Sequence, residues 1–149
     1  MHLTHLSLSF FISATALAQS SYSYLPNPAL TPGLAATTNV DEVCAKDYPK
    51  KARKVSEQTK SGVYYRYGVD QKECVDGCKI DHLIPLAIGG SNQVRNLWPH
   101  EYGAQWSVYK KTRLEVRLRR EVCAGQLDII EAQECIATDW TKCYQKFFY

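Results

Sequence analysis

An aspartate and a histidine stand next to each other, as Asp81-His82, in an apolar and β-prone run that continues to Leu86. An unperturbed imidazole titrates near neutral pH, so His82 can accept a proton from water. The Asp81 carboxylate offers a hard oxygen ligand to a divalent cation. Cleavage of a phosphodiester needs both a base and a cation that offsets negative charge. The pair therefore has the residue types for metal-assisted phosphodiester hydrolysis, but a lone Asp-His dipeptide is common and means little by itself.

The residues that follow give the pair a context. Successive side chains of a regular strand point to opposite faces, so Asp81 and His82 can share a site only where the strand ends or bulges. Pro85 cannot donate to a central ladder, and Gly89-Gly90 allows a turn with positive φ. We therefore expect an irregular hairpin loop soon after His82.

The far arm of this hairpin starts near Asn96. An amide side chain has both donor and acceptor atoms, so Asn96 can bridge backbone groups across the loop or orient His82. Leu97 and Trp98 are expected to pack under the hairpin, and Pro99 is expected to end it before a helix.

This hairpin closely resembles that of the HNH endonuclease family, which has a ββα-metal (His-Me finger) core. The matching residues are Asp-His-Leu-Ile-Pro-Leu-x-x-Gly-Gly-x-Asn at 81–92 and Asn-Leu-Trp-Pro at 96–99. Weaker similarities to exported members of the family lie at residues 31–33, 111–115, 122–125 and 137–140. The resemblance implies a small α+β fold with a ββα-metal core, flanking helices and stabilising disulfides.

The resemblance also implies roles for individual residues. His82 would be the general base that activates water, Asp81 a metal ligand, and Asn96 the residue that holds the loop and orients the base. One divalent ion, Mg²⁺ or Mn²⁺, would stabilise charge on the phosphate and the departing oxygen. Such single-metal hydrolysis leaves 5′-phosphate and 3′-hydroxyl ends.

The helix after the hairpin departs from the family pattern. A second metal ligand, His or Asn, is usual there, but residues 105–110 contain neither. Ser107 or Gln105 would supply an oxygen instead, with waters completing the shell, which magnesium tolerates. His100 is the only imidazole nearby, and its position just after Pro99 favours an exposed loop residue over a ligand.

Lysines and arginines gather near this site. Phosphate contacts supply most of the sequence-independent affinity for nucleic acid, so DNA, RNA or both are the expected partners. Glu115 and Glu121 can pair with cations one helical turn away, which would leave about half of the cations merely solvated. The residues expected to contact phosphates are Arg95, Lys110, Lys111, Arg113 and Arg117.

A basic segment and a cluster of tyrosines each have two possible roles. Residues 46–60 are rich in Lys and Arg, and this pattern suits a solvated charged face and a phosphate-binding surface equally well. Tyr64, Tyr65 and Tyr67 can stack on bases, but packing in the core or against the hairpin is favoured.

The first 18 residues are typical of a secretory signal peptide. Residues 3–17 contain no Asp, Glu, Lys or Arg, and Ala16-Leu17-Ala18 forms a small-x-small cleavage site. A membrane anchor is the alternative, but the apolar run is short for a span. Residues 19–38, rich in Ser, Pro, Ala and Thr, are expected to form a flexible leader. Residues 39–149 would then form a single HNH nuclease-like domain of a secreted protein.

The cysteines all lie beyond the signal peptide. An even number in an exported chain favours disulfides, although the sequence does not choose among the pairings. Cys74 and Cys78 can close a small loop, and a zinc knuckle is the less favoured alternative there. The residues expected to form disulfides are Cys44, Cys74, Cys78, Cys123, Cys135 and Cys143.

Residue patterns predict the remaining elements. A short helix is expected over residues 50–58, and residues 62–68 are aromatic and β-prone. A long helix is expected over residues 104–123, with Gly125 just beyond its end. A second helix is expected over residues 127–139, followed by an aromatic tail that packs back on the core.

These observations favour a secreted, metal-dependent endonuclease that cleaves DNA or RNA with low sequence specificity, because nothing indicates readout of bases. The formal net charge of +3 is weakly informative. One alternative is an HNH-fold protein with weakened catalysis that binds nucleic acid or another polyanion, which the missing helix ligand suggests. Another is a disulfide-rich secreted interaction protein without enzymatic activity.

Overall fold

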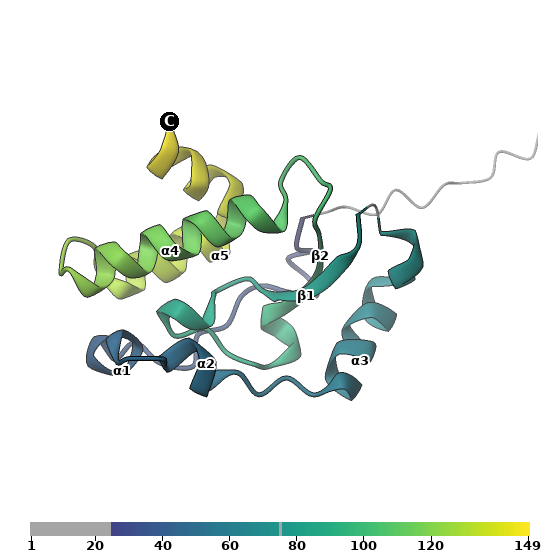
Figure 1. Ribbon diagram of the computed structural model, residues 1–149, viewed down its shortest axis with the longest axis horizontal. Coiled ribbons are helices and arrows are strands. Elements are labelled where there is room, and N and C mark those ends of the chain that lie inside the picture. Colours follow the sequence, from purple (N-terminus) through teal and green to yellow (C-terminus); the bar gives the residue numbers. More distant parts are fainter. Residues whose placement is uncertain (1–24, 75) are drawn as a thin grey trace, which may run out of the picture.

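The computed structural model describes residues 25–74 and 76–149. The predicted signal peptide and the first residues of the predicted leader therefore lie outside the described residues. Figure 1 shows the two-stranded hairpin between α3 on one side and the α4–α5 pair on the other. The helices and strands are α1 (Val40–Cys44), α2 (Tyr48–Ala52), α3 (Glu57–Tyr67), β1 (Cys78–His82), β2 (Leu97–Glu101), α4 (Val108–Cys123) and α5 (Ile129–Phe148).

This mixture of helices with a small antiparallel sheet agrees with the expected disulfide-stabilised α+β class. Within residues 25–74 and 76–149, no helix combines the length and the apolar character that a bilayer span requires.

β1 and β2 form the hairpin that the sequence predicts. The strands are antiparallel, and β1 ends at His82, which pairs with Leu97. The loop between them is irregular, with two short 3₁₀ turns. Gly89 lies there at φ 85°, and a Cβ on Gly90 would overlap the carbonyl oxygen of Ile84. The loop therefore requires glycine at both positions.

The expectation that Pro99 ends the hairpin is wrong. Pro99 lies inside β2, opposite Ile80 of β1. Proline lacks the N–H that a central strand must donate, but each strand of a two-stranded sheet has an outer edge that needs no donor. Leu97 and Trp98 are fully buried, in agreement with the predicted packing under the hairpin.

The β-prone segment 62–68 belongs to a helix, which corrects the sequence expectation. α3 begins after the capping side chain of Ser56 and ends at Gly68, which has a left-handed conformation. Its buried residues Val63 and Tyr64 pack against the hairpin. Two good caps and this tertiary contact outweigh the modest helix propensity of the aromatic residues.

The other predicted helices are present with different ends. Residues 53–56 are not helical and separate α2 from α3, in place of one predicted helix. α4 starts at Val108, four residues after the predicted start, and ends before Gly125, whose φ is 70°. α5 continues through a kink at Asp139 to Phe148, so the aromatic tail packs on the core as a helix.

Residues 30–37, which the sequence places in a flexible leader, lie against the hairpin loop. Thr31 is buried, and its hydroxyl donates to the carbonyl oxygen of Leu97 at 2.8 Å. The N–H of Ala36 donates to the carbonyl oxygen of Gly89 at 2.7 Å. An irregular loop has backbone groups without partners in regular structure, and this segment supplies partners for them. Residues 30–37 therefore pack against the domain.

All six cysteines form disulfides, which confirms that prediction. Cys74 and Cys78 close a small loop, so the zinc-knuckle alternative does not apply to them. The disulfide that spans the longest stretch of sequence joins α1 to the last residue of α4. The pairs are Cys44–Cys123, Cys74–Cys78 and Cys135–Cys143.

Removal of the Cys44–Cys123 disulfide should cost more stability than removal of the Cys135–Cys143 disulfide. The first closes 79 residues and the second closes 8, so the first removes more conformational entropy from the unfolded chain. The double serine variant at Cys44 and Cys123 should lose about 4 kcal/mol in free energy of unfolding, measured with urea. Equal losses in the two double variants would contradict this expectation.

Candidate active site

Asp81 is held by cations and by a histidine. Its Oδ2 accepts a hydrogen bond from Nδ1 of His100 at 3.0 Å, and its Oδ1 lies 3.4 Å from the ammonium of Lys79. Burial would raise the pKa of this carboxyl. The charge of Lys111, the hydrogen bond from His100 and the charge of Lys79 outweigh burial and hold the pKa well below its usual range. Asp81 is therefore an anion at neutral pH, although it is buried.

His100 is a buried member of this network, so the expectation of an exposed loop histidine is wrong. Its ring is fully buried and stacks on Trp98, with the ring centres 4.9 Å apart. Its Nε2 lies 2.8 Å from the carbonyl oxygen of Trp106. The cause is Pro99, which continues β2 and so places His100 on the same face of the hairpin as Asp81.

Lys111 brings an ammonium group from α4 to the end of β1. Its side chain is fully buried, and Nζ donates to the carbonyl oxygen of His82 and to the carboxylate of Glu115, both at 2.6 Å. Nζ also lies 5.2 Å from the ring centre of Trp98. Lys111 therefore joins two elements of the fold, and the expectation that it contacts phosphates at the surface is wrong.

Asn92 orients His82, a role that sequence reasoning missed. The Asn92 amide donates from Nδ2 to the carbonyl oxygen of Ala52 at 2.8 Å, and its Oδ1 accepts from the N–H of Lys54 at 3.2 Å. These two bonds turn Oδ1 toward Nε2 of His82, 3.2 Å away. An amide oxygen only accepts, so Nε2 carries the ring proton and Nδ1 has the lone pair that a general base needs.

The environment of His82 keeps its imidazole neutral. Burial lowers the pKa of His82 to about 4, and the charges of Arg53 and Lys111 act in the same direction. The hydrogen bond with Asn92 and the charge of Asp81 oppose this effect. His82 is therefore in the form of a base at neutral pH.

Asn96 bridges the hairpin loop, one of the two roles expected for it. Its fully buried amide accepts at Oδ1 from the N–H groups of Leu34 and Ile84, at 3.2 and 2.9 Å. Its Nδ2 donates to the carbonyl oxygens of Ile84 and Ser91, at 2.9 and 2.8 Å. All four bonds go to backbone groups, so Asn96 holds the loop, whereas Asn92 contacts the His82 ring.

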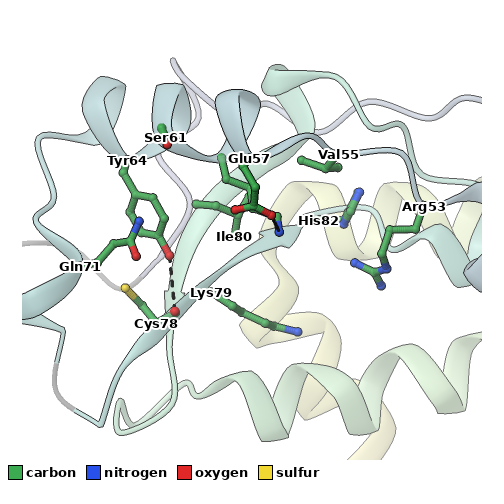
Figure 2. A pocket seen from close by; sticks show the side chains of 11 residues that line it. Arg53, Val55, Glu57, Ser61, Tyr64, Gln71, Cys78, Lys79, Ile80 and His82 are labelled. Atoms are coloured by element: carbon green, nitrogen blue, oxygen red, sulfur yellow. Dashed lines mark hydrogen bonds and ion pairs between the residues drawn. The ribbon is translucent and has the colours of Figure 1, made fainter.

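A cavity of about 380 Å³ runs along the outer edge of β1, between that strand and α3 (Figure 2). Figure 2 shows His82 and Arg53 at one end of this cavity and Tyr64 and Cys78 at the other. We call it the β1 trough, and its lining includes Arg53, Val55, Lys60, Tyr64, Lys79 and His82.

Asp81 and His82 have different surroundings. His82 lines the β1 trough, whereas Asp81 is bonded to His100 of β2 and is not part of that lining. Lys79 connects the two sides, because it lines the trough and pairs with Asp81. The described residues therefore do not place the two side chains in one open pocket.

The two expected helix ligands lie just before or at the start of α4. Ser107 is the N-cap residue and is buried, and its backbone carbonyl accepts from the N–H of Lys111 at 3.2 Å. Gln105 is exposed. In the described part of the chain, no hydrogen bond joins either side chain to Asp81.

The residues around Asp81 offer hard oxygen donors but no closed cage. Across residues 25–74 and 76–149, no three His, Cys, Asp or Glu side chains form a group that could hold a metal ion. Burial and the charge of Asp81 both raise the pKa of Glu115, against the opposing effect of Lys111. Both oxygens of Asp81 already contact the protein, so an ion bound there would have to displace one of these contacts and take its remaining ligands from water, a coordination that Mg²⁺ tolerates.

Most of the cations expected to contact phosphates also contact the protein. Lys110 and Arg113 each lie 4.9 Å from the centre of an aromatic ring. Arg117 forms an ion pair with Glu121 at 2.6 Å. Arg95 and Arg113 are exposed to solvent.

No family model, no curated protein and no solved structure matches the chain.

The His82 ring should show its protonation state directly in ¹H–¹⁵N spectra of the imidazole. At pH 7 we expect a neutral ring with the proton on Nε2, because Oδ1 of Asn92 faces that nitrogen. On acidification the ring should titrate near pH 4. The His82→Gln variant assigns the signal, and a proton on Nδ1 would contradict the expected orientation.

Burial of His82 should also make stability depend on pH. The pKa of His82 is about 4 in the folded chain against 6.5 for an ordinary histidine, so the unfolded chain binds more protons between these values. The free energy of unfolding should therefore fall as the pH is lowered from 6.5 to 4, by up to roughly 3 kcal/mol from this residue. Urea unfolding in EDTA at a series of pH values tests this. If the free energy of unfolding of His82→Gln fell with pH as steeply as that of the unsubstituted protein, the expectation would be contradicted.

Proposed function

We propose that the chain is a secreted, metal-dependent endonuclease of the HNH type that hydrolyses DNA or RNA with low sequence specificity. The observation that carries the proposal is the position of His82, a neutral imidazole at the end of β1 that lines a trough containing cations. The chain order β1, β2, α4, with the Asp-His pair at the end of β1, also supports it.

In the proposed reaction, His82 acts as general base. Its Nδ1 takes a proton from a water molecule, and the resulting hydroxide attacks the phosphorus atom. Asn92 keeps the ring in place through Nε2. The bond from phosphorus to the 3′ oxygen breaks, and this oxygen takes a proton from solvent, which leaves 5′-phosphate and 3′-hydroxyl ends.

Asp81 is the residue proposed to hold a divalent ion, Mg²⁺ or Mn²⁺. When bound there, the ion would supply positive charge that stabilises the phosphate and the departing oxygen, and the phosphate would have to reach it past Lys79, which lines the trough and contacts Asp81. His100 and Lys79 keep the carboxylate ionised and oriented by the contacts described above.

Export is part of the proposal. Three disulfides are typical of proteins that fold in oxidising compartments, and the first 18 residues have the pattern of a secretory signal.

A second candidate is an HNH-type protein that binds nucleic acid or another polyanion with weakened catalysis. Both oxygens of Asp81 already have partners in the protein, and the ammonium of Lys111 acts on the same carboxylate. A fixed cation at this position would attract phosphate groups without providing the open coordination sites of a metal ion.

Nicking of supercoiled plasmid should separate the two candidates. The nuclease should cut with Mg²⁺ or Mn²⁺ and stop in EDTA, and His82→Ala should lower the rate by at least about 100-fold, because a general base contributes roughly that much. Added imidazole should restore part of the activity of His82→Ala, because the β1 trough gives access to the vacated position.

The His82→Ala protein, purified identically, is the control for contaminating nucleases. Its Asn92 acceptor retains the N–H of Lys54, so the fold should persist, which circular dichroism checks. Binding of plasmid without metal-dependent cutting would favour the second candidate. Equal cutting by both proteins would reject the assigned role of His82.

A further inference from the structure

We propose that the β1 trough binds an unpaired nucleic-acid strand, with Arg53 as the main phosphate-binding residue. The inference names the substrate class of the proposed nuclease site and rests on that function. It places the substrate between β1 and α3, and not along the basic surface of α4 expected from the sequence.

Arg53 is the available cation beside His82. It is exposed, lines the β1 trough, and makes no hydrogen bond or ion pair with the described residues. The other two cations of the trough have carboxylate partners, Lys60 with Glu57 at 2.6 Å and Lys79 with Asp81 at 3.4 Å. A guanidinium can donate two parallel hydrogen bonds to one phosphate, so Arg53 suits a phosphate that lies against His82.

Three of the cations of α4 are committed to other contacts. Lys111 is buried with Glu115, and Arg117 pairs with Glu121. The guanidinium of Arg119 donates to backbone carbonyl oxygens of α1 and the residue after it, at 3.0 and 3.1 Å. Each would lose a protein contact by turning to a phosphate, whereas Arg53 would lose none.

The shape of the trough favours a single strand over a duplex. His82 is only 4% exposed, so the scissile phosphate has to enter the trough to reach the ring. The volume of about 380 Å³ lies in the range of roughly 300–1,000 Å³ typical of pockets that enclose a small ligand. An unpaired nucleotide can turn into such a space, whereas a duplex holds its bases stacked and paired.

The walls next to the phosphate position explain low sequence preference. Val55, Ile80 and Tyr64 contribute apolar lining between His82 and the far end of the trough. Contact of a base with apolar and aromatic groups does not depend on its hydrogen-bonding edge. The trough therefore accepts different bases while Arg53 holds the backbone.

Fluorescence anisotropy of labelled oligonucleotides tests the proposal without any cleavage. The protein is the full chain carrying His82→Ala, in EDTA, with a single strand of about 12 nucleotides and a hairpin duplex with an equal number of phosphates. The single strand should bind at least about tenfold more tightly. Equal or tighter binding of the duplex would overturn the single-strand assignment.

Two variants of equal charge change locate the phosphate. Arg53→Ala should weaken single-strand binding roughly tenfold and should lower the slope of log affinity against log salt concentration by the equivalent of about one phosphate contact. Arg53→Lys should recover part of the affinity. The matched control is Arg120→Ala on α4, which should stay within about twofold. The reverse result, with Arg120 important and Arg53 silent, would place the strand along α4 and overturn the proposal.

A neutral variant tests the cavity itself. Ser61 is exposed on α3 and lines the trough, so Ser61→Phe should fill it without changing any charge (Figure 2). Single-strand binding should fall about tenfold, and unchanged binding would overturn the trough as the site.

The trough proposal and the nuclease proposal can fail independently of each other. Binding that depends on Arg53 in a protein that never cuts would reject the nuclease and keep the trough. Cutting that requires His82 but is indifferent to Arg53 and Ser61 would keep the nuclease and reject the trough.

Discussion

The buried ammonium of Lys111 is the interaction on which the candidate site depends. It joins the last residue of β1 to α4 through the carbonyl oxygen of His82, and it neutralises part of the charge of Glu115 and Asp81. Without a cation, the buried carboxylate of Asp81 and the half-buried carboxylate of Glu115 would repel each other, so the site requires this partner. The same contact fixes the position of the end of β1 relative to α4, and therefore the position of the His82 ring.

Rigidity in the hairpin loop comes from side-chain amides in place of regular secondary structure. Asn96 satisfies backbone groups on both arms of the loop and on the segment that precedes α1. Asn92 in turn connects His82 to the chain between α2 and α3. Both amides are positioned by residues remote in sequence, so the orientation of the imidazole is a property of the whole domain.

The two faces of β1 divide the chemistry of the site. Asp81 faces a network of His100 and Lys111, where charge is compensated inside the protein. His82 faces a trough where an exposed cation, Arg53, has no carboxylate partner among the described residues. Lys79 lies between them. In the proposed nuclease, a phosphate would meet the base from the trough, and burial of the imidazole would hold that base neutral.

By itself the sequence determined that the cysteines pair, that an irregular hairpin with a glycine turn follows His82, and that a helix comes next. These features follow from local signals: glycine conformations, helix periodicity and an even number of cysteines. Local signals also predict that Pro99 ends the hairpin, but proline is tolerated in an edge strand and Pro99 lies inside β2. Only the tertiary structure decided that residues 62–67 belong to a helix, that His100 and Lys111 are buried, and that Asn92 orients His82. Each of these depends on contacts between residues far apart in the chain, which local propensity and spacing do not contain.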